Sequence, residues 1–376
     1  MRGFAFQTVP DIRFGAGVLA EAAEIVAKRG VKRVLVVTDE GVRGLGLIDP
    51  LLATLKAARM STEVFSEVVA DPPERIVLAA GEAAKGADLV IGFGGGSPLD
   101  TAKLAAALGT GRQPLRDMYG VDQVTASRLP LVLVPTTSGT GSEVTPIAIV
   151  TTGETTKSGV VSPVLYADTA LVDPDLTIGL PAEVTAATGI DAMVHAIEAY
   201  TSRHKKNPVS NALAREALRL LSVHVTGAVR DGARRDHRAG AMLGAMLAGQ
   251  AFANAPVAAV HALAYPLGGQ FHLPHGLSNS LVLPHVLRFN LPEARPLYAE
   301  LSREVGGAPG DADAFLARIQ TLCEEAGLAR KLREFGISHN HLPGLAEDAM
   351  AQTRLLQNNP REVTEADALA IYEAAW

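Results

Sequence analysis

The sequence has only one cysteine, Cys323, so the chain can form no internal disulfide bond. A single thiol fits a reducing compartment, and its apolar-periodic surroundings (Phe315, Leu316, Ile319 and Leu322) predict a packing residue. The first residues, MRGFAFQTVPD, lack the apolar region and the small-residue cleavage site of a secretory signal. We therefore expect a soluble, cytoplasmic protein.

The sequence also lacks a strong charge and a long apolar run. A formal net charge of −6 gives no electrostatic reason to expect nucleic acid or a membrane as partner. Residues 239–287 contain no Asp, Glu, Lys or Arg, but Gln250, Asn254, Pro256 and His261 interrupt this stretch. No apolar run of ~20 residues survives. Buried helices at the centre of a second domain are therefore predicted, rather than a membrane span.

The first 180 residues contain short apolar runs that alternate with Ala-rich stretches of helical length. The runs include residues 34–37, 89–91 and 131–134, and the stretches include residues 18–28 and 75–85. Continuously apolar strands that alternate with helices predict a parallel sheet with helices on both faces. This α/β architecture is typical of nucleotide binding, although architecture alone proves no function.

After Pro181 the strand-like runs stop. A length of 376 residues fits two domains, or three, and an apolar content of 48% is ordinary for a globular protein. We place the boundary near Leu180, with an α/β domain over residues 1–180 and an all-α domain over residues 181–376. In the second domain, helices are predicted at residues 183–201, 211–229, 239–254 and 364–375.

Four side chains form a candidate metal site. Asp191 and His195 are four residues apart in GIDAMVHAIEAY, which places them on one face of a helix; alone, the pair could also be an intrahelical hydrogen bond. His261 and His275 lie in the uncharged stretch, where an unpaired polar group is costly, and the alternative is two satisfied core histidines. One Asp and three His suit divalent iron, zinc or manganese. With four protein ligands, iron keeps an open position more readily than tetrahedral zinc.

The segment IGFGGGSPLDTAK follows a predicted strand and opens a helix. Ser97 is predicted as the N-cap, with Pro98 at the first helical position and Asp100 three residues beyond the cap. Glycines 94–96 allow backbone N–H groups to approach a pyrophosphate at the helix N-terminus. The segment is not the usual GxGxxG fingerprint, and the acidic residue comes earlier in the chain, as Asp39.

These segments resemble the iron-containing (group III) alcohol dehydrogenase family. GIDAMVHAIEAY and HALAYPLGGQFHLPHG are similar to its two signatures, and IRFGAG, GGGSPLDTAK, PTTSGTGSEVT and NNPREVTEADALAIYEAAW extend the similarity over nearly the whole chain. The resemblance implies a dehydroquinate synthase-like fold and reversible hydride transfer between a primary alcohol or aldehyde and NAD(H). It also implies a metal acting as Lewis acid on the substrate oxygen, Fe²⁺ or else Zn²⁺. The ligands that it implies are Asp191, His195, His261 and His275.

The resemblance extends to the cofactor site. Asp39 matches the position beside the adenosine ribose, where a carboxylate accepts from the 2′-hydroxyl and repels a 2′-phosphate, so NAD is expected rather than NADP. A helix or turn cap is the alternative for Asp39. Asp71 stands where relatives usually carry Asn. The other cofactor-binding positions that the resemblance implies are Gly95, Gly96, Ser97, Asp100, Thr136, Thr137, Ser142, Thr145 and Lys157.

In one respect the chain departs from the family. Many relatives have a histidine four residues after the third ligand, where this chain has Tyr265. Tyr265 and His272 are the candidate catalytic residues for proton transfer, and His272 could instead be a packing residue. Phe252 is expected near the substrate pocket or as a core aromatic. The resemblance also implies a homodimer.

Other functions remain open on the sequence alone. A glycerol-dehydrogenase-like or dehydroquinate-synthase-like enzyme would share the fold but uses a different metal set. A maleylacetate-reductase-like enzyme generally lacks the full ligand set, so the intact Asp191 and His195 argue against it. A non-catalytic protein that binds a metal or a nucleotide is the alternative from a different class.

Overall fold

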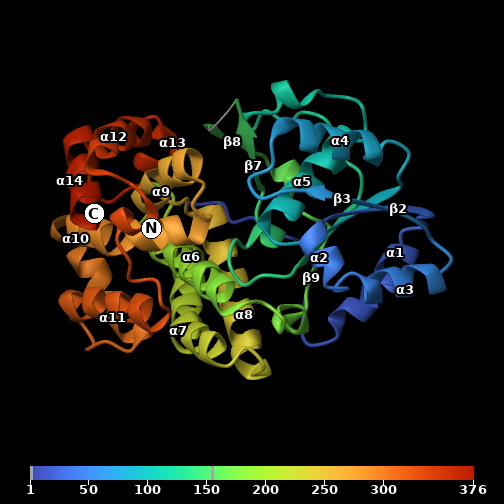
Figure 1. Ribbon diagram of the computed structural model, residues 1–376. Coiled ribbons are helices and arrows are strands. Elements are labelled where there is room, and N and C mark those ends of the chain that lie inside the picture. Colours follow the sequence, from blue (N-terminus) through green and yellow to red (C-terminus); the bar gives the residue numbers. More distant parts are fainter. Residues whose placement is uncertain (1–2, 154–155) are drawn as a thin grey trace. The chain divides into compact units, whose positions relative to one another are not determined.

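The computed structural model describes residues 3–153 and 156–376, and these form two compact units (Figure 1). The first, called here the sheet unit, comprises Gln7–Thr137 and Gly141–Ile178. The second, the helical unit, comprises Gly179–Trp376 together with residues 3–6 and Ser138–Thr140. These last two segments precede residue 180 in the chain, yet they belong to the helical unit. Gly139 lies so close to Thr188 that an added Cβ would stand 2.7 Å from the Thr188 Cβ.

A six-stranded sheet forms the centre of the sheet unit. Its strand order is β1-β9-β6-β4-β2-β3, and every pairing is parallel. In that order the strands are Ile12–Phe14, Thr169–Val172, Leu131–Pro135, Leu89–Gly94, Arg33–Asp39 and Ser61–Val68. The predicted parallel sheet is confirmed.

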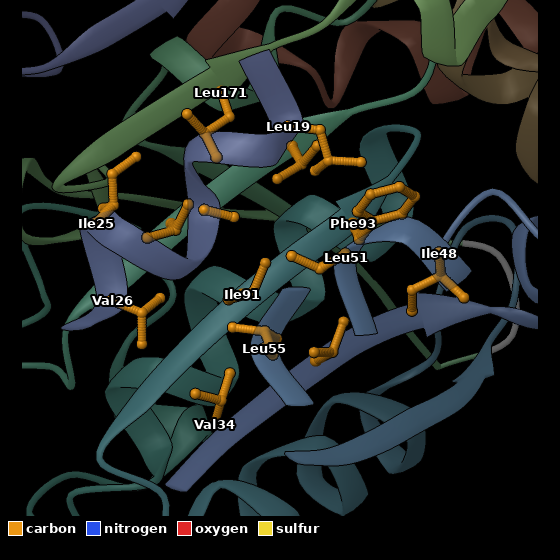
Figure 2. Packing of buried hydrophobic residues seen from close by; sticks show 14 of the residues in the cluster. Leu19, Ile25, Val26, Val34, Ile48, Leu51, Leu55, Ile91, Phe93 and Leu171 are labelled. Atoms are coloured by element: carbon orange, nitrogen blue, oxygen red, sulfur yellow. The ribbon is translucent and has the colours of Figure 1, made fainter. Parts of the chain in front are cut away.

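Helices cover both faces of this sheet, which explains why its strands are continuously apolar. On one face, Ile91 and Phe93 of β4 pack in a cluster with Leu51 and Leu55 of α3 (Asp49–Ala57), and α1 (Ala22–Ala27) contributes to the same cluster (Figure 2). On the other face, Gly92 packs against α5 (Gly96–Leu108), where an added Cβ would stand 2.7 Å from the Cβ of Ala102.

The sheet unit has further elements that the sequence pattern did not predict. A second sheet has the order β5-β8-β7, formed by Gly120–Val121, Thr156–Val161 and Ile147–Thr152, with β7 and β8 antiparallel. The stretch 18–28 is split into a 3-10 turn, Val18–Glu21, and α1. The remaining helices of the unit are α2 (Glu40–Gly44) and α4 (Glu74–Ala84).

The helical unit is built around α6 (Ala182–Thr201), which contacts α7 (Pro208–Arg230), α8 (Arg235–Asn254) and α10 (His275–Ser302). The uncharged residues 239–287 lie in α8, α9 (Ala259–Phe271), the first half of α10 and the short segments between these helices, and they are largely buried as predicted. The helices that follow α6 are α7 (Pro208–Arg230), α8 (Arg235–Asn254), α9 (Ala259–Phe271), α10 (His275–Ser302), α11 (Ala312–Glu325), α12 (Leu342–Met350), α13 (Thr353–Leu356) and α14 (Glu365–Ala375).

Within the described ranges, no single helix has the length and apolar composition that crossing a membrane requires. Among the same residues, only α8 and α9 taken together meet that requirement, and the chain bends by 105° between them.

Candidate functional site

The helix α6 carries the first two predicted ligands into the interior of the helical unit. Asp191 and His195 are 2% and 4% exposed, because α7, α8 and α10 surround the apolar helix on which they lie. Their spacing places both side chains on one face of α6. The distance between Asp191 Oδ1 and His195 Nε2 is 4.0 Å, so the two do not form the intrahelical hydrogen bond considered as an alternative.

The helices α9 and α10 bring the other two predicted ligands to Asp191. His261 lies in the first turn of α9, and His275 is the first residue of α10. The beginning of α10 approaches α6 closely at Gly276, where an added Cβ would stand 2.2 Å from the carbonyl oxygen of Ala187. A side chain at position 276 would therefore separate His275 from Asp191.

Two of the three predicted histidine ligands lie close to one carboxylate oxygen of Asp191. Asp191 Oδ1 lies 3.5 Å from His275 Nε2 and 3.6 Å from His261 Nε2. Two atoms that bind one cation at 2.0–2.2 Å stand about 3.0–3.6 Å apart. Asp191, His261 and His275 thus already form a group with suitable spacing. His195 does not belong to this group, since its Nε2 is 4.0 Å from Asp191 Oδ1, and its ring stacks on His261 and on Phe252.

A carboxylate outside the predicted set orients one of these imidazoles. Glu198, one turn beyond His195 on α6, accepts a hydrogen bond from His261 Nδ1 at 2.6 Å. It also accepts one at 2.7 Å from the backbone N–H of Val260, so it caps the beginning of α9 from a neighbouring helix. With the proton on Nδ1, the lone pair of His261 Nε2 points toward Asp191.

The electrostatics of the cluster fit a divalent cation. Burial lowers the pKa of His195 to about 3, so its imidazole is neutral at physiological pH. Burial also opposes ionisation of Asp191, but the three imidazoles and a hydrogen bond from Asn279 outweigh it and lower the pKa of this carboxyl. Glu198 similarly outweighs the effect of burial on His261 and raises its pKa. A metal-bound imidazole is neutral at its ligating nitrogen, so a divalent cation bound here would displace any proton on His261 Nε2. A carboxylate together with imidazoles is a donor set that divalent iron and zinc prefer.

The candidate catalytic residues lie at different places around this cluster. Tyr265 is half-buried one turn after His261 on α9, and its ring centroid is 5.9 Å from that of His275. His272 is exposed and ends α9 in the left-handed conformation, with a φ of 54°. Among the described residues, it does not belong to the group with metal-ligand spacing. Phe252 is buried, and its ring centroid is 4.2 Å from that of His195.

Several predicted cofactor residues meet at the carboxyl edge of the six-stranded sheet. Asp39 ends β2 and lies close to Gly94, which ends β4. An added Cβ on Gly94 would stand 3.4 Å from Asp39 Oδ2. Thr136 follows β6, and its N–H donates to the Gly94 carbonyl. The Thr137 side chain lies beside Gly95, the N-cap of α5, where an added Cβ would stand 3.6 Å from it. Parallel α/β sheets bind ligands at this edge.

The prediction for Ser97 as helix cap is wrong. The helix α5 begins at Gly96, and Gly95 is its N-cap. Glycine adopts such a position readily, so the helix starts earlier than the serine indicated. The Ser97 hydroxyl instead accepts a 3.3 Å hydrogen bond from the N–H of Asp71.

Asp71 and Lys157, two further predicted cofactor residues, form an ion pair with each other. Lys157 Nζ lies 2.8 Å from Asp71 Oδ1, and it donates to the hydroxyl of Thr151. Asp71 has a φ of 52°, a conformation that Asn and Asp tolerate better than most residues do. This explains how Asp can stand where relatives usually carry Asn.

Three other predicted cofactor residues are bound to a buried lysine that the sequence reasoning did not single out. Lys103 is fully buried, and its Nζ donates to Ser142 Oγ at 2.7 Å and to Thr145 Oγ1 at 3.2 Å. Asp100 accepts from Ser142 Oγ and lies 3.4 Å from Lys103 Nζ. Burial lowers the pKa of Lys103 against the attraction of Asp100. This network joins α5 to the segment that follows β6.

Sequence reasoning thus missed Glu198, Asn279 and Lys103, although helical spacing could have indicated the first two. Glu198 lies three residues after His195, and Asn279 lies four residues after His275, so each shares a helix face with a predicted ligand. Lys103 lies inside an apolar helix, GSPLDTAKLAAAL, where a charged residue needs a partner.

Comparison with known proteins shows the family of this chain. Residues 10–174 match the family model described as iron-containing alcohol dehydrogenase, and residues 185–376 match the C-terminal model of the same family. The long-chain-alcohol dehydrogenase 1 of Geobacillus thermodenitrificans is 42% identical, with 98% of this chain and 95% of the relative covered.

Solved structures extend the similarity to the whole fold. A 1,3-propanediol oxidoreductase has a TM-score of 0.95 at 34% identity, with both chains fully covered. A sulfoacetaldehyde reductase from Bifidobacterium kashiwanohense, solved in complex with NAD+, has a TM-score of 0.90 at 28% identity, with 100% of this chain and 99% of that chain covered. The resemblance noted in the sequence is confirmed: the chain belongs to the iron-containing alcohol dehydrogenase family and is an oxidoreductase of that metal-dependent type.

Proposed function

We propose that this chain catalyses reversible hydride transfer between a primary alcohol or aldehyde and NAD(H), with Fe²⁺ as its metal. The observation that carries the proposal is the convergence of three imidazole nitrogens on the buried carboxylate of Asp191. A divalent cation held there supplies a Lewis acid for the oxygen atom of the substrate, and the nicotinamide supplies or accepts the hydride.

The ligands that we propose are Asp191, His195, His261 and His275. Glu198 fixes the tautomer of His261 and therefore the direction of its lone pair. Zinc binds the same donor set at least as tightly. We propose iron because the family models that match the chain are those of iron-containing enzymes, and because four protein ligands leave an open position on iron more readily.

Proton transfer is proposed for Tyr265. Its phenol is a hydrogen-bond donor and acceptor, lies beside His275, and is partly exposed. His272 is exposed at the end of the same helix, so we propose that it exchanges protons with the solvent and does not touch the substrate.

We propose that the cofactor binds at the carboxyl edge of the six-stranded sheet. Gly95 and Gly96 open α5, where backbone N–H groups can bind a pyrophosphate. At Gly95 an added Cβ would meet only the Thr137 side chain within 4 Å, which leaves room for this group. Asp39 is proposed to accept from the ribose 2′-hydroxyl and so to select NAD. We propose that Lys157 and Asp71 contribute to the cofactor site as an ion pair. Asp100, Ser142 and Thr145 contribute to it through their contacts with Lys103.

We further propose a cytoplasmic homodimer. The one thiol, Cys323, is buried, and burial raises its pKa to about 12, so it fits a packing role in a reducing compartment. Light scattering should give about twice the chain mass of 39.2 kDa; a single-chain mass would contradict the dimer.

A panel of substrates with a histidine variant tests the central proposal. Purified protein is loaded anaerobically with Fe²⁺, and NADH absorbance is followed with primary alcohols, diols and hydroxy acids. We expect turnover by the wild type. His261→Ala should stay folded but lose the metal and at least about 10³-fold in kcat/KM, because the proposed Lewis acid is no longer held.

The matched control is His285→Ala, a half-buried histidine from the same uncharged stretch that lies outside the cluster. It should retain both metal and activity. Turnover by metal-free protein would contradict the proposal. Bound metal without turnover on any substrate would favour the non-catalytic alternative.

A further inference from the structure

The side chain of Asn279 lies among the proposed metal ligands, although it belongs to none of the sequence motifs of the site. It is completely buried on α10, one turn after His275. Its Nδ2 lies 2.6 Å from Asp191 Oδ1, 3.3 Å from His275 Nε2 and 3.5 Å from His261 Nε2. One amide group therefore contacts three of the four proposed ligands.

The oxygen atom of the Asn279 amide differs from its nitrogen in its surroundings. Within the described ranges, Asn279 Oδ1 is buried and has no hydrogen-bond partner. A buried polar atom without a partner destabilises a protein relative to an apolar group of the same shape. Stability alone therefore does not account for an asparagine at this position.

The hydrogen bond to Asp191 explains why residue 279 is an asparagine. Asp191 has two oxygen atoms and rotates about its side-chain bonds, so a carboxylate ligand needs a donor that holds it in one orientation. Asn279 supplies an N–H donor at the same oxygen that faces the imidazoles. It also lies on α10 with His275, so it couples the position of Asp191 on α6 to that of His275 on α10.

We propose that Asn279 is a positioning residue of the metal centre, which holds the Asp191 carboxylate in its metal-binding orientation. This inference rests on the proposed function, because it assumes that Asp191 is a ligand. Substitution of residues that orient metal ligands typically lowers metal affinity by about 10- to 100-fold.

The test compares the full-length wild type with Asn279→Leu, whose side chain has nearly the same shape but donates no hydrogen bond. Co²⁺ is the probe, because it binds oxygen and nitrogen sites and its visible absorption depends on coordination geometry. Affinity is measured by competition with a chelator. We expect N279L to bind Co²⁺ about 10- to 100-fold more weakly with altered absorption bands, while a cooperative thermal unfolding transition shows that the variant is folded.

Ser280→Ala is the matched control, because Ser280 is a buried polar residue of the same helix that hydrogen-bonds to Leu277 of that helix. It should bind Co²⁺ like the wild type. If N279L does not fold, Asn279→Ala is measured instead with the same expectation.

The possible outcomes separate the two proposals. If the wild type binds no Co²⁺, the proposed metal centre itself is wrong. If the wild type binds Co²⁺ and N279L binds it equally tightly with the same spectrum, only the role of Asn279 is overturned. A lower unfolding temperature without a change in affinity would likewise overturn it, since that result indicates a packing role.

Discussion

At the scale of single residues, Asp39 combines two roles that one substitution can separate. Its Oδ1 accepts a 2.8 Å hydrogen bond from the Val42 N–H and caps α2, as the alternative interpretation of the sequence suggested. The cap does not exclude a cofactor role, because a carboxylate has several acceptor sites. Asparagine caps helices as well as aspartate does, but it has no charge to repel a 2′-phosphate.

We therefore predict that the wild type prefers NAD and that Asp39→Asn weakens this preference while the protein remains stable. The ratio of kcat/KM with NAD to kcat/KM with NADP should fall about 10-fold, which corresponds to about 1.4 kcal/mol. Asp49→Asn, at an exposed acidic residue nearby in the chain, should leave the ratio unchanged. A wild-type preference for NADP would contradict the assignment of Asp39.

The proposed ligands could be predicted individually, but their environment could not. The spacing of Asp191 and His195 within one helix indicates by itself that the two side chains share a face. That Glu198 reaches His261 Nδ1, and that Asn279 reaches Asp191, depends on how α6, α9 and α10 approach one another. These tertiary contacts between helices cannot be inferred from one sequence alone.

At the scale of elements, the proposed metal site requires α10 to approach α6 closely. Gly276→Ala places a Cβ against the backbone oxygen of Ala187, which cannot move aside as a flexible side chain would. We expect the first turn of α10 to shift and to carry His275 away from Asp191. Overpacking of this kind costs about 1–3 kcal/mol, and metal affinity should fall by at least about 10-fold.

Chelator competition and thermal unfolding measure the two effects of Gly276→Ala. The control is Gly268→Ala in α9, where the nearest contact of the added Cβ is an ordinary 3.5 Å. Alanine is favoured over glycine inside a helix by about 0.5–1 kcal/mol, so this variant should be as stable as the wild type or more stable. Equal metal affinity in both variants would refute the importance of the approach at Gly276.

Elements were predictable where one local pattern dominates. The buried strand β4 is apolar over its whole length because helices cover both of its faces, and α6 shows a long apolar helical stretch. The hairpin of β7 and β8 was not predicted, since β8, Thr156–Val161, is polar and mostly half-buried. The start of α5 was misplaced because a serine and a glycine can both cap a helix, and the local sequence does not decide between them.

At the scale of the whole molecule, the chain length and the change of pattern after Pro181 predicted two domains, but not that Ser138–Thr140 belongs to the helical unit. Nor did they predict that charged groups are buried inside the sheet unit. Glu143 is 4% exposed, and burial raises its pKa to about 7, against its own backbone hydrogen bond and the charge of Lys103. Lys103 itself is completely buried.

This raised pKa makes the stability of the sheet unit depend on pH. The folded state binds the proton of Glu143 more tightly than the unfolded state, whose glutamate has a pKa near 4.5. The stabilisation is therefore complete below pH 4.5 and is lost as the pH rises through about 7, with a slope of up to about 1.4 kcal/mol per pH unit. Lys103 has the opposite effect on stability. Because its pKa is lowered in the folded state, its contribution to the free energy of unfolding rises with pH between that lowered pKa and 10.5.

Glu143→Gln removes the titration of this carboxyl group. The free energy of unfolding of the variant, relative to that of the wild type, should therefore be higher at about pH 8 than at about pH 5. Any constant cost of the buried amide cancels in the comparison of the two pH values. Urea unfolding, followed for the transition of the sheet unit, measures the difference. Glu63→Gln, at an exposed glutamate of β3, should show no such gain. A difference between E143Q and the wild type that is the same at both pH values would mean that Glu143 is equally ionised in the folded and unfolded chain.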